Sequence, residues 1–186
     1  ADLERLDAVF GAQLLVGSEY ILIDETLCAQ RLRYDAPMRQ PWILFAAGGS
    51  DPTHVLPHLY AMTRILGGAL GEPQYVYAVG QAADPWTITS LPDWAWVTGF
   101  HRRLVRQAAL CVSLWGTTVF EALALGTPVL AMTRTASETE DAERLEAATD
   151  GAVRSLGRLE GLMRETLCGR LESLWYVVKI RLHMHH

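Results

Sequence analysis

The chain has 186 residues, of which half are hydrophobic, and its formal net charge at neutral pH is −5. This length can bury one sizeable core, so we expect one domain rather than two small ones. The negative charge argues against a protein that works by neutralising nucleic-acid phosphates, and no apolar run approaches the roughly 20 residues that cross a bilayer.

The first 40 residues do not follow a regular alternation of strands and helices. Residues 14–23 resemble a strand and turn, and residues 31–40 resemble a proline-containing linker. We expect residues 1–40 to connect this chain to a further N-terminal domain and residues 41–182 to form the domain itself. Residues 183–186 are interpreted as a tail, and its histidines are left out of any metal argument.

The first predicted strand, residues 42–47, runs into a turn and a helix. Asp51 is placed to cap that helix with Pro52 at its first position. Apolar residues then recur at helical spacing at Val55, Leu56, Leu59, Met62 and Leu66. The Gly48-Gly49 pair is either a strand-to-helix turn that needs positive φ or a loop that faces a ligand. We favour the ligand, because open sheets bind at the carboxyl ends of their strands.

Two more strands are predicted at residues 74–80 and 95–98, with a loop between them over residues 82–93. A short basic helix follows at residues 101–109. Its arginines form either a solvated face or a phosphate clamp. His101 at its start either hydrogen-bonds a base edge or a phosphate, or is a solvated neighbour of the helix cap.

The most informative stretch is the predicted strand at residues 110–114 with the helix behind it. Gly116 makes a tight turn, Thr117 and Thr118 open the helix, and Glu121 lies one turn in. The amides and the positive dipole end of such a helix suit a phosphate or diphosphate. Thr118-x-x-Glu121 also has capping-box spacing, in which case Glu121 only satisfies helix amides.

The chain continues with a Gly-Thr-Pro stop and a strand at residues 128–132. Ser137-x-x-Glu140 has capping-box spacing and is predicted to open a helix to about residue 148. Residues 159 to about 182 are helical in composition. Strands that alternate with helices in this order predict an α/β fold, a Rossmann-like and mostly parallel sheet with helices on both faces.

Three motifs give the chain a family resemblance. They are Gly17-Ser18-Glu19-Tyr20, Gly48-Gly49-Ser50-Asp51-Pro52, and Gly116-Thr117-Thr118-x-x-Glu121-Ala122-x-Ala124-x-Gly126-x-Pro128. Together they resemble the nucleotide-sugar hydrolases of pseudaminic acid synthesis and their spore-coat polysaccharide relatives. More broadly, the pattern is similar to the C-terminal half of GT-B glycosyltransferases, including the family 28 type. The resemblance extends from about residue 14 to residue 157.

The resemblance implies a site for UDP or a UDP-sugar, with no cofactor or metal required. In such proteins the turn at Gly116, Thr117 and Thr118 meets the diphosphate, and the helix carboxylate, here Glu121, accepts hydrogen bonds from the ribose hydroxyls. The resemblance also implies that Phe100 and His101 lie against the uracil. It places Gly48, Gly49 and Ser50 at the cleft toward a second domain, and Glu140 and Asp141 toward the sugar.

This sequence departs from the family pattern in three places. Trp115 stands where relatives have a small residue, and Glu140-Asp141 stands where they carry an Asn-Gln-like pair. The family's hydrolases also have an N-terminal domain with a histidine expected to activate water, and nothing before residue 40 supplies one. We therefore expect a C-terminal half with unknown catalytic residues, which pairs with a missing N-terminal domain or subunit or forms a homodimer.

Several functions follow from this resemblance. The first is half of a UDP-sugar hydrolase in surface-polysaccharide or nonulosonate synthesis. The alternatives are the donor-binding half of a glycosyltransferase and a binding or scaffold module without turnover. The same turn also suits other phosphorylated metabolites, because no residue here reads a base by itself.

The spacing of the cysteines and histidines predicts a cytoplasmic protein without a metal site. Three cysteines are widely spaced and form no CxxC pair, which is typical of reduced thiols. The start of the chain also lacks a signal-peptide pattern. His54 and His58 have a spacing that zinc ligands use, but with no third ligand in view a surface role is expected.

Overall fold

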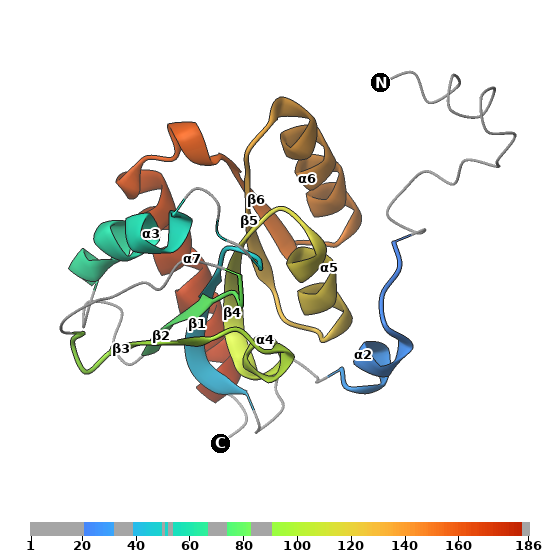
Figure 1. Ribbon diagram of the computed structural model, residues 1–186, viewed down its shortest axis with the longest axis horizontal. Coiled ribbons are helices and arrows are strands. Elements are labelled where there is room, and N and C mark those ends of the chain that lie inside the picture. Colours follow the sequence, from blue (N-terminus) through green and yellow to red (C-terminus); the bar gives the residue numbers. More distant parts are fainter. Residues whose placement is uncertain are drawn as a thin grey trace, which may run out of the picture.

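The computed structural model describes residues 21–31, 39–49, 51, 54–66, 74–82 and 91–183. Six parallel strands form one sheet in the order β3-β2-β1-β4-β5-β6 (Figure 1). The strands are β1 (Gln40–Ala46), β2 (Gln74–Val79), β3 (Ala95–Gly99), β4 (Ala108–Leu114), β5 (Val129–Thr133) and β6 (Val153–Arg158). The first five lie within two residues of their predicted bounds, so the predicted Rossmann-like α/β fold is confirmed.

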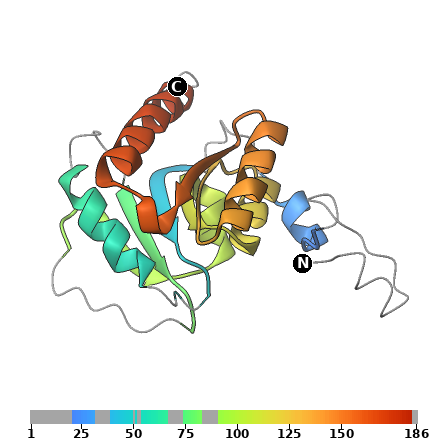
Figure 2. The same cartoon turned by 90° about the horizontal axis from the view of Figure 1, so that it is seen from above.

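Helices cover both faces of the sheet (Figure 2). They are α2 (Glu25–Ala29), α3 (Val55–Thr63), α4 (Arg102–Gln107), α5 (Thr117–Ala124), α6 (Ala136–Ala148) and α7 (Arg164–His183), with short 3₁₀ turns η2 (Arg64–Leu66) and η3 (Leu159–Gly161). Helices α3 and α7 share one core with Phe45, while α2, α4, α5 and α6 share the other with Leu44. Successive strand side chains point to opposite faces, so a strand covered on both sides is apolar throughout. All seven residues of β4 are accordingly buried.

The helix after β1 begins later than its sequence predicts. Asp51 does cap it, because Oδ1 accepts from the Val55 amide at 2.7 Å and Oδ2 from the Leu56 amide at 3.3 Å. The residue before the first turn is His54, in the left-handed region at φ 50°, whereas Pro52 lies outside the described residues. The five apolar residues predicted to face the core are all buried.

Helix α6 also begins at a different cap. Thr135 accepts from the Glu138 amide at 3.1 Å, and the Glu138 carboxylate accepts from the Arg134 amide at 2.7 Å. The capping contacts therefore lie two residues before the predicted Ser137-x-x-Glu140. Both patterns have the same spacing, and the end of β5 decides which of them stands at the turn.

The predicted connecting segment contains elements that pack on the domain. Helix α2 is capped by Asp24, and its Leu27 is only 1% exposed. Arg39 is buried and donates from Nη1 to the Ala108 carbonyl at 2.9 Å and from Nη2 to the Gly126 carbonyl at 2.6 Å. It therefore anchors the start of β1 rather than forming part of a linker. The motif residues 17–20 lie outside the described residues.

Strand β6 was not predicted. It is an edge strand that contains two arginines and a glycine, and only Val153 and Leu156 of its six residues are buried, one in each core. Its periodicity is therefore weak. In the described part of the chain, no helix is long and apolar enough to span a bilayer.

Candidate functional site

The order of the strands reverses between β1 and β4. Strand β1 continues into α3 on one face of the sheet, whereas β4 continues into α5 on the other face. The two strands are paired in parallel, with Ala46 opposite Ser113, so the loops that follow them leave the sheet at the same edge. Such a switch point is where open α/β sheets bind ligands. The two glycine turns predicted from the sequence are therefore brought to one place.

The turn after β1 is held by the strand beside it. Gly48 has φ 83°, a region that favours glycine. The Gly49 carbonyl accepts from the Ala82 amide at 2.9 Å. A β-carbon on Gly80 would overlap the carbonyl oxygens of both turn glycines. Gly80 is thus a supporting residue that sequence reasoning missed, and Ser50 lies outside the described residues.

The turn after β4 leads directly into α5. Gly116 precedes the helix at φ 157° and ψ −167°, which is essentially a glycine-only conformation, and no side chain caps the helix. Thr117 is exposed and Thr118 is buried. The first turn of α5 contains no acidic residue. The positive end of the helix is therefore not occupied by a carboxylate of its own.

Trp115 is tied to the sheet and packs on α5. Its amide donates to the Met132 carbonyl at 2.6 Å. Its indole meets the Phe120 ring edge-on, with ring centroids 5.4 Å apart. This large residue at the turn is therefore accommodated by an aromatic partner on the next helix.

Glu121 is part of an ion cluster and not of a capping box. Its Oε1 accepts from Arg102 Nε at 3.3 Å and from Nη2 at 3.0 Å. A capping box needs Thr118 as the cap, but the cap is Gly116, two residues earlier. The capping-box interpretation of Glu121 is therefore wrong, and its carboxylate faces the start of α4 instead.

The start of α4 carries the residues predicted to lie against a base. Phe100 is partly buried against the core below α5, and its amide donates to the Val79 carbonyl at 2.8 Å. His101 is exposed and caps α4 through its backbone, with no hydrogen bond from its side chain. The ion pair of the next residue, Arg102, with Glu121 brings this segment against α5.

Glu140 and Asp141 lie on the surface of α6. Their side chains are 67% and 50% exposed and pair with Arg144 on the same helix. No hydrogen bond or ion pair joins them to the glycine turns in the described part of the chain.

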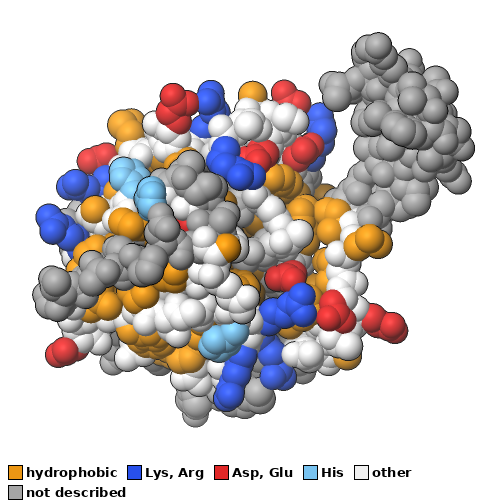
Figure 3. All heavy atoms as spheres, viewed as in Figure 1, with side chains coloured by type: hydrophobic (Ala, Val, Ile, Leu, Met, Phe, Trp, Pro, Cys, Tyr) orange, Lys and Arg blue, Asp and Glu red, His pale blue; other side chains and the backbone are white. Residues whose placement is uncertain are grey.

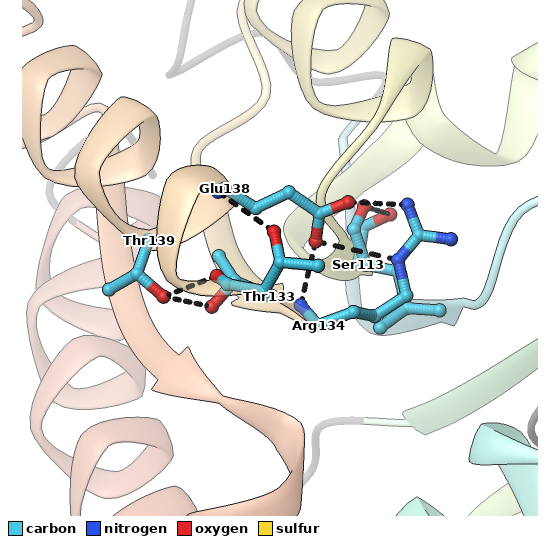
Figure 4. A network of polar contacts seen from close by, with 7 residues as sticks. Ser113, Thr133, Arg134, Glu138 and Thr139 are labelled. Atoms are coloured by element: carbon cyan, nitrogen blue, oxygen red, sulfur yellow. Dashed lines mark hydrogen bonds and ion pairs between the residues drawn. The ribbon is translucent and has the colours of Figure 1, made fainter. Parts of the chain in front are cut away.

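A different pair follows β5 at the carboxyl edge of the sheet. Arg134 Nη2 donates to Glu138 Oε1 at 2.6 Å, and Figure 4 shows the two side chains facing each other at the turn into α6. Burial by itself would raise the pKa of Glu138, but hydrogen bonds from the Arg134 side chain and backbone lower it below its ordinary value. The carboxylate is therefore held in its charged form, and Arg134 is a basic group that sequence reasoning missed.

The two histidines with zinc-like spacing lie at the start of α3 and within it. His54 precedes the helix and His58 is exposed. Among the described residues, no three His, Cys, Asp or Glu side chains gather to hold a metal.

Comparisons with known proteins bear on the fold. No family profile matches the chain. The spore coat polysaccharide biosynthesis protein SpsG of Bacillus subtilis (strain 168) is 24% identical over 176 residues, which cover 91% of this chain and 51% of SpsG. The solved glycotransferase of kitacinnamycin superposes with a TM-score of 0.56 and 18% identity, over 81% of this chain and 41% of that protein. The spinosyn forosaminyltransferase SpnP gives a TM-score of 0.49 at 16% identity, over 87% of this chain and 42% of that protein.

These likenesses support a coarse assignment. The chain spans about half the length of its curated relative, a polysaccharide biosynthesis protein. The likeness to the kitacinnamycin glycotransferase shows the fold alone, because the identity is 18%. The described residues form a Rossmann-like α/β domain, a fold that the chain shares with part of the kitacinnamycin glycotransferase.

Proposed function

We propose that this domain binds the nucleotide part of a nucleoside-diphosphate sugar, with a UDP-sugar as the first candidate. The observation that carries the proposal is the meeting of the Gly48-Gly49 turn and the Gly116 turn at the point where the strand order reverses. Open sheets of this type bind nucleotides there. Glu121 stands one helical turn beyond the second glycine and supplies a carboxylate to the same edge.

The start of α5 is the proposed diphosphate site. Gly116 has no β-carbon and no neighbour within 4 Å of where one would stand, so a phosphate can approach its backbone closely. The first amides of the helix have no side-chain cap and point out of its positive end. These features favour an anion with two or more oxygens directed at the backbone.

Glu121 is the proposed ribose ligand. A carboxylate only accepts hydrogen bonds, and the two hydroxyls of a ribose are donors that match it. Phe100 and His101 are proposed to lie beside the base, because the Arg102 ion pair keeps their segment against α5. Glu140 and Asp141, which are exposed on α6, stay a proposal for the sugar end of the ligand.

The proposed reaction is hydrolysis of the nucleotide sugar, in surface-polysaccharide or nonulosonate synthesis. Water attacks the anomeric carbon and breaks its bond to the phosphate oxygen, or attacks the β-phosphorus and displaces the sugar. Either route yields the free sugar and UDP, which carries added negative charge. The amides at the start of α5 stabilise that charge. The spore coat relative supports this pathway class, and the base is proposed to lie outside the described domain.

Glycosyl transfer is the second candidate, and the fold of the kitacinnamycin glycotransferase favours it. The donor site is the same in both reactions, since an acceptor hydroxyl replaces water. Donor binding is therefore the part of the proposal that this chain can test directly.

Calorimetric titration of the chain with UDP, CMP and inorganic pyrophosphate at fixed salt tests the proposal. We expect UDP to bind more tightly than pyrophosphate, because ribose and base add contacts to those of the diphosphate. Equal affinities for UDP and pyrophosphate would reduce the site to an anion site. Binding of none of the three would contradict the proposal and favour a scaffold.

A further inference from the structure

The ion pair between Arg102 and Glu121 engages only half of the carboxylate. Both hydrogen bonds from Arg102, from Nε at 3.3 Å and from Nη2 at 3.0 Å, end on Oε1. Oε2 accepts no hydrogen bond from the described residues. The Glu121 side chain is 19% exposed, so the carboxylate is partly accessible while one of its oxygens is held.

Arg102 is itself held from the other side. Its Nη1 donates to Asp24 Oδ2 at 3.4 Å, so all three guanidinium nitrogens have an acceptor. Asp24 Oδ1 in turn accepts from the Thr26 amide at 2.9 Å and hydroxyl at 2.7 Å. These Thr26 hydrogen bonds, with a smaller effect of Arg102, lower the pKa of Asp24. The chain of contacts runs from the cap of α2 through Arg102 to the proposed ribose ligand.

Helix α2 is a fixed support for this chain of contacts. Leu27 packs in the core beneath α5, and Arg106 Nε donates to the Gln30 carbonyl at 2.9 Å at the other end of the helix. Figure 3 shows the basic side chains gathered over α4, with acidic side chains beside them toward α2 and α5. Two arginines of α4 therefore attach α2 next to the nucleotide site.

We infer that Arg102 is a positioning residue for the nucleotide. It holds Oε1 of Glu121 so that Oε2 is directed at a ribose hydroxyl, and Asp24 fixes the guanidinium in that orientation. A lysine cannot replace this geometry, because a single ammonium lacks the planar fork that serves two carboxylates. The inference rests on the proposed nucleotide site and goes beyond it.

The test compares Arg102→Ala with Arg103→Ala. Arg103 is the next residue of α4, is exposed, and makes no ion pair with the described residues, so the control removes the same charge from the same helix. Each variant is titrated with UDP, with 2′,3′-dideoxy-UDP and with pyrophosphate, after circular dichroism has confirmed its folding.

We expect Arg102→Ala to weaken UDP binding about twofold to fivefold relative to Arg103→Ala, the range for a partly exposed ion pair. Binding of dideoxy-UDP and of pyrophosphate should match the control, because neither offers ribose hydroxyls to Glu121. Arg102→Lys should not restore UDP affinity. Asp24→Asn should show a smaller loss in the same direction and serves as the second variant if Arg102→Ala does not fold.

Three outcomes overturn the inference. A loss of affinity for all three ligands beyond the control would mean that Arg102 binds the phosphates directly. If the unmodified chain binds UDP more tightly than dideoxy-UDP but Arg102→Ala and Arg103→Ala have the same affinities, Arg102 has no positioning role. The proposed nucleotide site would not be affected by that result. Failure of the unmodified chain to bind UDP would reject the proposed function, and the inference with it.

Discussion

Glu121 is proposed to serve ligand binding more than folding. Its carboxylate is paired with an arginine whose side chain is 51% exposed. Such pairs contribute at most about 1 kcal/mol to stability, because water and salt screen them. Glu121 also makes no capping contact at the start of α5. Its removal should therefore separate an effect on ligand affinity from an effect on the free energy of unfolding.

Glu121→Ala should weaken UDP binding by about 1–3 kcal/mol, or about fivefold to 150-fold, because hydrogen bonds to a charged group are lost. Calorimetry measures the affinity, and thermal unfolding should show a small change. Glu160→Ala is the matched control, since Glu160 pairs with Arg158 and is 81% exposed. A lowered melting temperature with unchanged affinity would instead give Glu121 a role in folding only.

At the scale of elements, the site depends on turns that neighbouring strands hold in place. The turn after β1 is fixed by Gly80 and Ala82, which follow β2. The turn after β4 is fixed by the hydrogen bond that the Trp115 amide donates to the Met132 carbonyl on β5. Both turns are therefore supported by backbone contacts with the next strand of the sheet, and a change in the supporting strand should be felt at the site.

Gly80→Ala should disturb the turn after β1. Its new β-carbon would overlap two backbone carbonyls, so the turn has to shift. We expect a loss of about 1–3 kcal/mol of unfolding free energy in urea, typical of overpacking, together with weaker UDP binding.

Gly169→Ala is the control for this substitution. Gly169 lies inside α7 with no atom within 4 Å of the added carbon, and alanine there should stabilise the chain by about 0.5–1 kcal/mol. If Gly80→Ala has the same free energy of unfolding and the same UDP affinity as the unmodified chain, Gly80 does not support the turn.

At the scale of the whole molecule, a parallel sheet covered on both faces buries ionisable side chains in their protonated form. Burial raises the pKa of the Cys111 thiol on β4 from 9.0 to about 12. It also raises the pKa of Tyr75 and of Tyr77 on β2, although the hydrogen bond between Tyr77 and Thr63 by itself lowers the pKa of Tyr77. The folded chain therefore keeps protons that the unfolded chain releases at alkaline pH.

The free energy of unfolding should accordingly fall as the pH rises above about 9. Each raised pKa contributes stability in full below the pKa of the unfolded group, and this stability is lost as the pH rises through the folded pKa. Urea unfolding at about pH 7.5 and about pH 10.5 measures the change. Cys111→Ala removes one of these groups and should make the free energy of unfolding depend less on pH. A free energy that stays level or rises with pH in the unmodified chain would refute the prediction.

The proposed division of labour makes a prediction about turnover. The described domain is proposed to bind the ligand and stabilise the leaving group, while the base is proposed to lie elsewhere. The 186-residue chain should therefore release UDP from a UDP-sugar no faster than buffer does. Release above background that Glu121→Ala abolishes would show that the chain carries its own base.

The sequence by itself determined the local and periodic features of this protein. Five strands, the apolar face of α3 and both glycine turns were predictable, because strand period, helix spacing and turn chemistry are properties of neighbouring residues. Gly126 shows the same, since it ends α5 at φ 77° as a glycine stop predicts. The meeting of the two turns at the carboxyl edge of the sheet could also be predicted, because such turns lie at the carboxyl ends of parallel strands.

Only the tertiary structure decided which partners these residues have. Glu121 meets a residue 19 positions away, and that residue meets another 78 positions away. Arg39 finds its acceptors 69 and 87 positions along the chain. The order of the strands and the choice between two capping boxes of equal spacing were also open. Such contacts depend on how helices pack across the sheet, and no local pattern specifies that packing.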